Sequence, residues 1–267
     1  MRIGLSCAAF YGQGETEDAA QKVCRFPAEA CEVFMQTPSE YCADFGRIVR
    51  ERLGTLPCCS IHPLGTQFEH QLFGRSARQT EDAFRLFTGV CDAGQALGAA
   101  YYVFHGPFGV HGPIRPESIP RLPEVFARMQ EIAHERGLTV LWENVHWCAL
   151  RGPAEVETLI RLLPQVQFVL DTKQAHLAGF VPGELLRAMG SRVKHVHALD
   201  VAEDGKLCLP GQGQTDWPAL LRQLRGQGFD GTVVLEPYGQ QAADEAALAD
   251  ALRLLRAAAE HAESAVV

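Results

Sequence analysis

Residues 166–171 read VQFVLD, a short apolar run that ends in a carboxylate and leads into a helical pattern. Similar runs recur along the whole chain, separated by segments with helical periodicity. The predicted strands are 2–7, 30–35, 57–62, 100–105, 138–143, 166–171, 192–197 and 231–236. Strands of this length alternating with helices are typical of right-handed βαβ units that share one parallel sheet.

The segments between the predicted strands carry apolar residues at three- and four-residue spacings, as one buried helix face requires. Examples are Phe84, Phe87 and Cys91, then Leu122, Phe126, Met129 and Ala133, then Leu248, Leu252, Leu255 and Ala259. A glycine falls shortly before five of the strands, where the preceding helix needs a left-handed C-terminal residue. These glycines are Gly54, Gly98, Gly137, Gly190 and Gly228.

The chain has 267 residues, and eight strand–helix units use nearly all of them. About 250 residues is the usual size of one (β/α)₈ TIM barrel. We therefore predict an α/β protein with a single barrel domain over residues 1–267, whose tail at 262–267 frays. An open doubly wound sheet is the alternative. It usually has a glycine-rich turn after the first strand, and Gly12-Gln13-Gly14 lacks the third glycine and begins too late.

Composition and charge exclude several classes of protein. Hydrophobic residues make up 47% and charged residues 21%, which is an ordinary globular composition. The longest apolar run falls short of the roughly 18 residues of a membrane helix. The net charge of −8 argues against nucleic acid as the main partner. The first residues lack the layout of a signal peptide, so we expect a cytoplasmic protein.

Nine cysteines are present, and they form neither a C-x-x-C pair nor a zinc-ribbon spacing. In a cytoplasmic protein we interpret them as reduced thiols that pack as small apolar side chains. A reactive thiol at Cys7 or Cys148 is the alternative, because both positions lie near predicted strand ends.

Polar residues stand at the ends of the last six predicted strands, and in a barrel of this kind function sits at those ends. The six residues are His62, His105, Glu143, Asp171, His197 and Glu236. Such a series is improbable by chance. A lone histidine is nevertheless often only a hydrogen-bonded structural group, which stays open for His62 and His105. We assign four other histidines to structural or loop positions, with His195 one layer deeper in the barrel: His111, His146, His176 and His195.

Glu143, Asp171 and Glu236 each end a hydrophobic strand, and buried acids are rare without a partner. Three carboxylates in one barrel mouth repel each other, and a divalent cation is the simplest way to keep them ionised. With His197 they close four neighbouring strands and so form an arc around one point. Three oxygen ligands and one imidazole suit Mn²⁺, with Mg²⁺, Co²⁺ and Zn²⁺ as alternatives.

This arrangement predicts chemistry on a sugar or a similar carbonyl compound. The cation would polarise the carbonyl and stabilise an enediolate. One of the two glutamates, Glu143 or Glu236, would remove the α proton, and the other would return a proton to the opposite face, which is epimerisation. Return of the proton to the neighbouring carbon would instead be isomerisation.

Two further features lie on the same rim. Residues 210–217 contain a Gly-x-Gly that permits close backbone approach to a ligand, or that serves only a tight loop. Lys173 follows Asp171 by two positions, where it reaches a substrate oxygen or phosphate, or is simply solvated.

Taken together, these motifs resemble the sugar phosphate isomerase/epimerase family of xylose isomerase-like barrels, over the whole chain. That group also holds ketose 3-epimerases, inosose dehydratases and endonuclease IV-type enzymes. The motifs are Glu32-Val33-Phe34-Met35-Gln36-Thr37, Ile61-His62-Pro63, Val103-Phe104-His105-Gly106, Glu143-Asn144-Val145, Leu170-Asp171-Thr172-Lys173-Gln174-Ala175, His195-Val196-His197-Ala198-Leu199-Asp200, Pro210-Gly211-Gln212-Gly213 and Leu235-Glu236-Pro237.

The resemblance implies a set of roles. The ketose epimerase pattern makes four residues the metal ligands and the two glutamates among them the acid and base: Glu143, Asp171, His197 and Glu236. We predict that His62, His105, Lys173 and Gln174 contact the substrate, a small sugar-like molecule. Barrels of this type frequently pair, so a homodimer is an option.

The chain departs from the family pattern at three places. Gln174 stands where a histidine is frequent, and Glu203 stands where ketose 3-epimerases have an arginine. Residues 205–207 replace the Asp-x-His of endonuclease IV-type enzymes, so a three-zinc phosphodiesterase site is incomplete. Two alternatives to an isomerase stay open: a metal-dependent lyase that dehydrates an inosose or keto-sugar, and a sugar-binding barrel without turnover.

Overall fold

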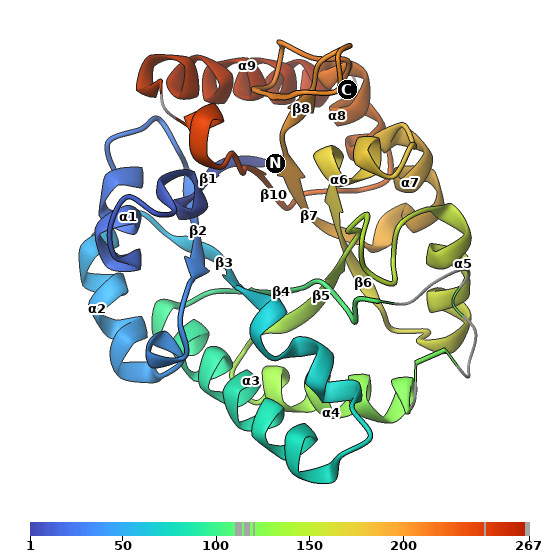
Figure 1. The fold of residues 1–267 in the computed structure, drawn as a ribbon. Coiled ribbons are helices and arrows are strands. Elements are labelled where there is room, and N and C mark those ends of the chain that lie inside the picture. The colour runs from blue at the N-terminus through green and yellow to red at the C-terminus, as the bar shows by residue number, and fades with distance from the viewer. Residues whose placement is uncertain (110–113, 115–117, 120, 243, 265–267) are drawn as a thin grey trace.

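Eight parallel strands close into a barrel in the computed structural model, which describes residues 1–109, 114, 118–119, 121–242 and 244–264 (Figure 1). The ring order is β1-β10-β7-β6-β5-β4-β3-β2. Their bounds are β1 Arg2–Ser6, β2 Ala30–Met35, β3 Cys58–Pro63, β4 Tyr101–Phe104, β5 Thr139–Glu143, β6 Gln167–Asp171, β7 Val193–Ala198 and β10 Thr232–Leu235. Each strand begins and ends within one residue of its predicted bounds, so the predicted (β/α)₈ barrel is confirmed.

Helices form a ring around the barrel, as Figure 1 shows. They are α1 Thr16–Val23, α2 Ala43–Leu53, α3 Ala77–Leu97, α4 Leu122–His134, α5 Pro153–Leu162, α6 Thr172–Leu177, α7 Pro182–Met189, α8 Trp217–Gly226 and α9 Glu245–Ser264. Short 3₁₀ segments lie in the connections between these elements: η1 Cys7–Phe10, η2 Pro38–Glu40, η3 Gly65–Gln67, η4 Glu69–Phe73, η5 Gly190–Arg192 and η6 Gly239–Ala242. None of the described helices is both long and apolar enough to cross a membrane.

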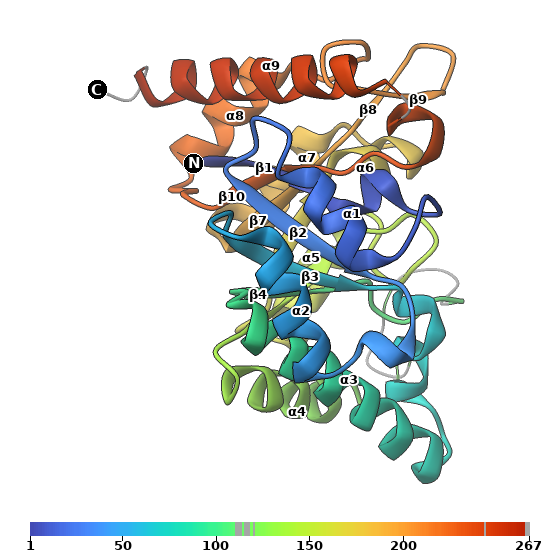
Figure 2. The ribbon, with the colours of Figure 1, turned by 90° about the vertical axis from the view of Figure 1, so that its left-hand side faces the viewer.

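The predicted apolar helix faces pack against the outside of the barrel. Every position named for these faces on α3, α4 and α9 is buried. The five predicted helix-ending glycines have φ between 56° and 82°, as left-handed residues do. Helix α9 lies along one side of the barrel in Figure 2 and continues to Ser264 with Ala262 buried, which shortens the tail that we expected to fray. Residues 265–267 of that tail lie outside the described part of the chain.

The register of the strands brings their carboxyl ends to one opening. Asp171 on β6 pairs with His197 on β7, and Val234 on β10 pairs with His197 from the other side. A small antiparallel hairpin of β8 (Asp200–Val201) and β9 (Leu207–Cys208) lies in the connection after β7. The strand pattern did not predict this hairpin, because its two strands have only two residues each.

All nine cysteines are free thiols. Burial raises the pKa of Cys7 to about 12, and burial also raises the pKa of Cys148. A thiol with a raised pKa is a poor nucleophile because little thiolate is present at neutral pH. Neither residue lines the cavity described below. The structure therefore supports the packing interpretation over a reactive thiol.

Candidate metal centre

Four buried side chains converge at the carboxyl ends of the strands. Glu143 ends β5, Asp171 ends β6, His197 lies near the end of β7 and Glu236 directly follows β10. One potential ligand atom from each lies within 4.8 Å of the others, and none of the four is more than 2% exposed. The structure thus brings together the arc of residues expected from the strand ends.

Two carboxylate oxygens in this group have no hydrogen-bond partner among the described residues: Glu143 Oε2 and Asp171 Oδ2. Their sister oxygens do have partners. Glu143 Oε1 lies 2.7 Å from His197 Nδ1, and Asp171 Oδ1 accepts a 2.7 Å hydrogen bond from the backbone N–H of Gln174. A buried carboxylate oxygen without a donor is unfavourable, and a cation removes that penalty. Three carboxylates and an imidazole therefore fit a divalent ion here.

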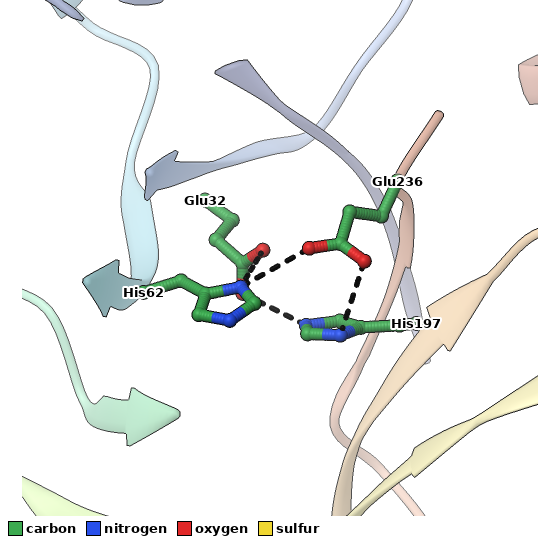
Figure 3. A group of neighbouring side chains, drawn as sticks. All are labelled: Glu32, His62, His197 and Glu236. Carbon is green, nitrogen blue, oxygen red and sulfur yellow. Dashed lines mark hydrogen bonds and ion pairs between the residues drawn. The ribbon is translucent and has the colours of Figure 1, made fainter. Parts of the chain in front are cut away.

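Glu32 extends this group on the far side of His197, and the sequence reasoning assigned it no role (Figure 3). It lies in β2 and is fully buried. Glu32, His62, His197 and Glu236 form a second set whose ligand atoms lie within 4.8 Å of one another. The one available sequence signal was a charged residue in the middle of the apolar run of β2, and such a residue needs a buried partner.

Opposite charges keep the carboxylates and imidazoles of this second set ionised. Burial alone would raise the pKa of Glu32, but the imidazoles of His197 and His195 hold it well below its usual range. Burial alone would lower the pKa of His62, but the carboxylates of Glu236 and Glu32 raise it to about 10. His62 Nδ1 lies 3.1 Å from Glu236 Oε1 and 3.5 Å from Glu32 Oε1.

Lys173 reaches into the same group from α6. Its ammonium lies 3.3 Å from Glu236 Oε2 and 3.5 Å from Asp171 Oδ2, and its side chain is only 7% exposed. Burial would lower the pKa of Lys173, but these carboxylates raise it above its usual range. The alternative of a solvated lysine is therefore wrong. Burial raises the pKa of Asp171 to about 7, although the nearby ammonium opposes this.

His105 has a carboxylate partner of its own, Glu69 on η4, which the sequence reasoning also missed. His105 Nδ1 lies 3.3 Å from Glu69 Oε2, and Glu69 Oε1 accepts a 2.9 Å hydrogen bond from the hydroxyl of Tyr102. On the opposite edge of its ring, His105 Nε2 lies 2.9 Å from His62 Nε2. Gly65 leaves room for this pair, because a Cβ there would lie 2.2 Å from Glu69 Oε2.

A cavity of about 380 Å³ opens above these groups. Its polar floor includes all four residues that we predicted to contact a substrate: His62, His105, Lys173 and Gln174. Its walls carry aromatic and aliphatic side chains: Tyr11, Phe34, Leu64, Trp147, Leu177, Leu207 and Tyr238. A concave site with apolar walls and a few convergent polar groups is typical of small-molecule binding.

Three of the four histidines assigned to structural or loop positions are described by the structure, and they lie outside the quartet. His195 contacts Glu32 one layer below His197, His146 pairs with the Gln174 amide, and His176 lies 3.1 Å from the hydroxyl of Thr215. His111 lies outside the described residues.

The Gly-x-Gly loop at 210–217 contributes no lining residue to this cavity. It packs instead on Asp200, whose carboxylate accepts hydrogen bonds from the backbone N–H of Thr215 and the indole of Trp217. A Cβ at Gly213 would lie 2.5 Å from that carboxylate. The structure therefore supports the tight-loop alternative. Glu203 is exposed in the turn of the β8–β9 hairpin and does not line the cavity either.

Fold and site together define a class: a (β/α)₈ barrel whose opening holds buried carboxylates and imidazoles that fit a divalent ion. The chain belongs to the xylose isomerase-like TIM barrel family, whose model matches residues 21–258. The family predicted from the sequence motifs is thereby confirmed.

Known proteins of several kinds are similar to the chain. An inosose dehydratase of Lacticaseibacillus casei is 22% identical over an alignment of 136 residues, and the match covers 43% of this chain and 46% of that protein. The chain thus matches about half the length of this curated relative. A D-tagatose 3-epimerase-like protein superimposes with a TM-score of 0.79 at 16% identity over 100% of both chains. An IOLI protein with a zinc atom superimposes with a TM-score of 0.75 at 19% identity over 98% of both. At these identities the superpositions establish a shared fold.

Proposed function

We propose that the chain is a divalent-metal-dependent isomerase or epimerase that acts on a sugar, keto-sugar or sugar phosphate. The observation that carries this proposal is the convergence of four buried ligand groups at a substrate-sized cavity, two of them with a carboxylate oxygen that has no hydrogen bond. The similarity to an epimerase-like structure and to an inosose dehydratase supports the same general chemistry.

Glu143, Asp171, His197 and Glu236 would hold the ion, with Mn²⁺ as the leading candidate. When bound, a divalent ion polarises a carbonyl and stabilises the negative charge that develops on its oxygen. The cavity above the four residues is where the carbonyl compound would lie.

The two glutamates would move the proton. The carboxylate of one takes the proton from the carbon next to the carbonyl, and the electrons of that C–H bond shift toward the carbonyl oxygen. The carboxylic acid of the other returns a proton, either to the same carbon from the opposite face or to the former carbonyl carbon. The first outcome is epimerisation. The second is isomerisation, in which the proton of the α hydroxyl also passes to the former carbonyl oxygen.

Lys173 and Tyr238 hold the carboxylate of one of the two glutamates, Glu236, in a fixed position. The Tyr238 hydroxyl donates a 2.8 Å hydrogen bond to Glu236 Oε1, and the Lys173 ammonium lies 3.3 Å from Glu236 Oε2. Both side chains also line the cavity, so the Lys173 ammonium can donate to a substrate oxygen and the Tyr238 hydroxyl oxygen can accept from a substrate hydroxyl. A preorganised acid of this kind loses little freedom during proton transfer.

Solvent deuterium exchange tests the proposal. The purified protein with Mn²⁺ is incubated in D₂O with ketoses, inososes and phosphosugars, and deuterium next to the carbonyl is measured by NMR. We expect metal-dependent exchange on at least one compound class, and losses of about 10²- to 10⁴-fold in Glu143→Gln and Glu236→Gln. Glu203→Gln, at an exposed position away from the cavity, is the control. Absence of exchange across the whole panel contradicts the proposal.

A dehydratase is the second candidate, and the similarity to an inosose dehydratase favours it. The same glutamate would remove the same α proton, after which the hydroxyl on the next carbon would take a proton from the carboxylic acid of the other glutamate and leave as water, and a carbon–carbon double bond would form. The enone-like product absorbs in the near ultraviolet, whereas an epimerised sugar does not. Absorbance during turnover therefore separates the two candidates.

A further inference from the structure

We propose that Glu32 is a positioning residue, which holds the imidazole of His197 so that its Nδ1 faces the metal ion. This inference rests on the proposed function, because it assumes that the quartet binds an ion. Figure 3 shows Glu32 and Glu236 on two sides of the His197 ring, joined to it by dashed contacts.

The Glu32 carboxylate is anchored by side chains from two other strands. Its Oε2 accepts a 2.8 Å hydrogen bond from the Ser60 hydroxyl on β3, where Ser60 is also its register partner. The same oxygen lies 3.0 Å from His197 Nε2 and 3.2 Å from His195 Nε2, both on β7. These four side chains are at most 1% exposed, so water does not compete for the contacts.

Metal binding decides which nitrogen of His197 keeps its proton. A carboxylate oxygen only accepts, and both ring nitrogens face one, so an ion bound by the quartet would need the lone pair of Nδ1 and would leave the proton on Nε2, pointing at Glu32. The opposite nitrogen, Nδ1, lies 2.7 Å from Glu143 Oε1, 3.5 Å from Glu236 Oε2 and 3.9 Å from Asp171 Oδ2. With its lone pair free, Nδ1 completes a set of three carboxylates and one imidazole. Metal-bound histidines commonly have such a carboxylate on the other ring nitrogen.

Glu32 is better suited to this role than to binding the same ion. The set of atoms within 4.8 Å that contains Asp171 and Glu143 does not include Glu32. Its Oε2 already has three polar partners, and its Oε1 lies 3.5 Å from His62 Nδ1, which is not a member of the quartet. Its position on the far side of the His197 ring therefore makes it act through the imidazole.

Mn²⁺ affinity measured without turnover tests the inference. Free Mn²⁺ gives a sharp six-line electron paramagnetic resonance signal that is lost on binding, so titration yields a dissociation constant for each variant. We expect Glu32→Gln to bind Mn²⁺ about 10- to 100-fold more weakly than the wild type. The matched control is Glu40→Gln, which removes another buried carboxylate close to β2 that bonds Thr16 and the backbone of Gln36.

The outcomes separate the inference from the proposed function. If the wild type binds no divalent ion, the proposed function fails. If the wild type binds Mn²⁺ and Glu32→Gln binds it equally well, the inference alone is overturned. Equal weakening in Glu32→Gln and Glu40→Gln also overturns it, because any lost buried carboxylate would then have the same effect.

A spectroscopic measurement on the wild type does not depend on a folded variant. In the Zn²⁺-loaded protein with ¹⁵N-labelled histidine, long-range ¹H–¹⁵N spectra report which ring nitrogen carries the proton. We expect the proton of His197 on Nε2 and the metal on Nδ1. A proton on Nδ1 would overturn the inference whatever the variants do.

Discussion

Replacing Lys173 by methionine removes the ammonium from the buried acids while it keeps a long apolar stem. Lys173 lies 3.3 Å from Glu236 and 3.5 Å from Asp171, and the side chains of all three are at most 7% exposed. The variant leaves two buried carboxylates without this compensating charge, so we expect a large loss of stability.

The size of the expected loss of stability follows from the burial of the three charged side chains. Removing one partner of a buried ion pair costs about 3–5 kcal/mol, because the other charge stays desolvated. Each kcal/mol shifts the melting temperature of a domain of this size class by about 2–4 °C. The metal-free Lys173→Met protein should therefore melt roughly 6–20 °C below the wild type.

Lys206→Met is the matched control. The Lys206–Asp204 pair is closer, at 2.6 Å, but its side chains are 82% and 54% exposed. Exposed pairs contribute little because water solvates both charges. If distance alone set the energy, the control would be the more damaging change. We expect the reverse in thermal unfolding followed by circular dichroism after treatment with chelator.

Adding Mn²⁺ sharpens the test. A cation among the same carboxylates replaces the missing charge, so Mn²⁺ should raise the melting temperature of Lys173→Met more than that of the wild type. Equal melting of Lys173→Met and wild type, or equal loss in the two lysine variants, would refute the electrostatic reasoning. A loss that Mn²⁺ does not diminish would show that the lysine acts through packing instead.

Three further outcomes are expected. Gly65→Ala should destabilise the protein by about 1–3 kcal/mol in denaturant unfolding, because its Cβ would lie 2.2 Å from Glu69 Oε2 and 2.6 Å from His105 Nδ1. Gly226→Ala, in α8 with no atom within 4 Å of the new Cβ, should instead stabilise it by about 0.4–1 kcal/mol; destabilisation by both would disprove the steric explanation. Trp147→Ala on the cavity wall should raise KM with little change in kcat for an exchange-active substrate, and a fall in kcat alone would contradict a binding role. Chelation should lower the melting temperature of the wild type, since an ion at 100 times its Kd stabilises the protein by about 2.7 kcal/mol.

The barrel could be predicted from the chain because its signals are local. Apolar runs, helix periodicity and helix-ending glycines each involve residues within a few positions of one another. The same reasoning placed acids and histidines at successive strand ends, and parallel strands bring those ends to one opening. Prediction of the quartet followed from Glu143, Asp171 and Glu236 ending apolar strands, a pattern visible without any long-range contact.

The supporting residues could not be predicted in this way. Glu32 contacts His197 across 165 positions of sequence, and Glu69 contacts His105 across 36 from an irregular segment. Neither stands at a strand end, so nothing local marked its partner. The ion pairs of Lys173 and the packing of residues 210–217 on Asp200 likewise depend on how loops fold over the opening.

The physical reason is that periodicity specifies which face of an element is buried, but not which side chain it meets there. That second property depends on closure of the barrel and on the register between strands, which together bring β2 and β3 opposite β7. Local sequence patterns thus established the eight-stranded architecture and the ends where chemistry is expected. The direction in which each imidazole and carboxylate points was established only when the ring closed around them.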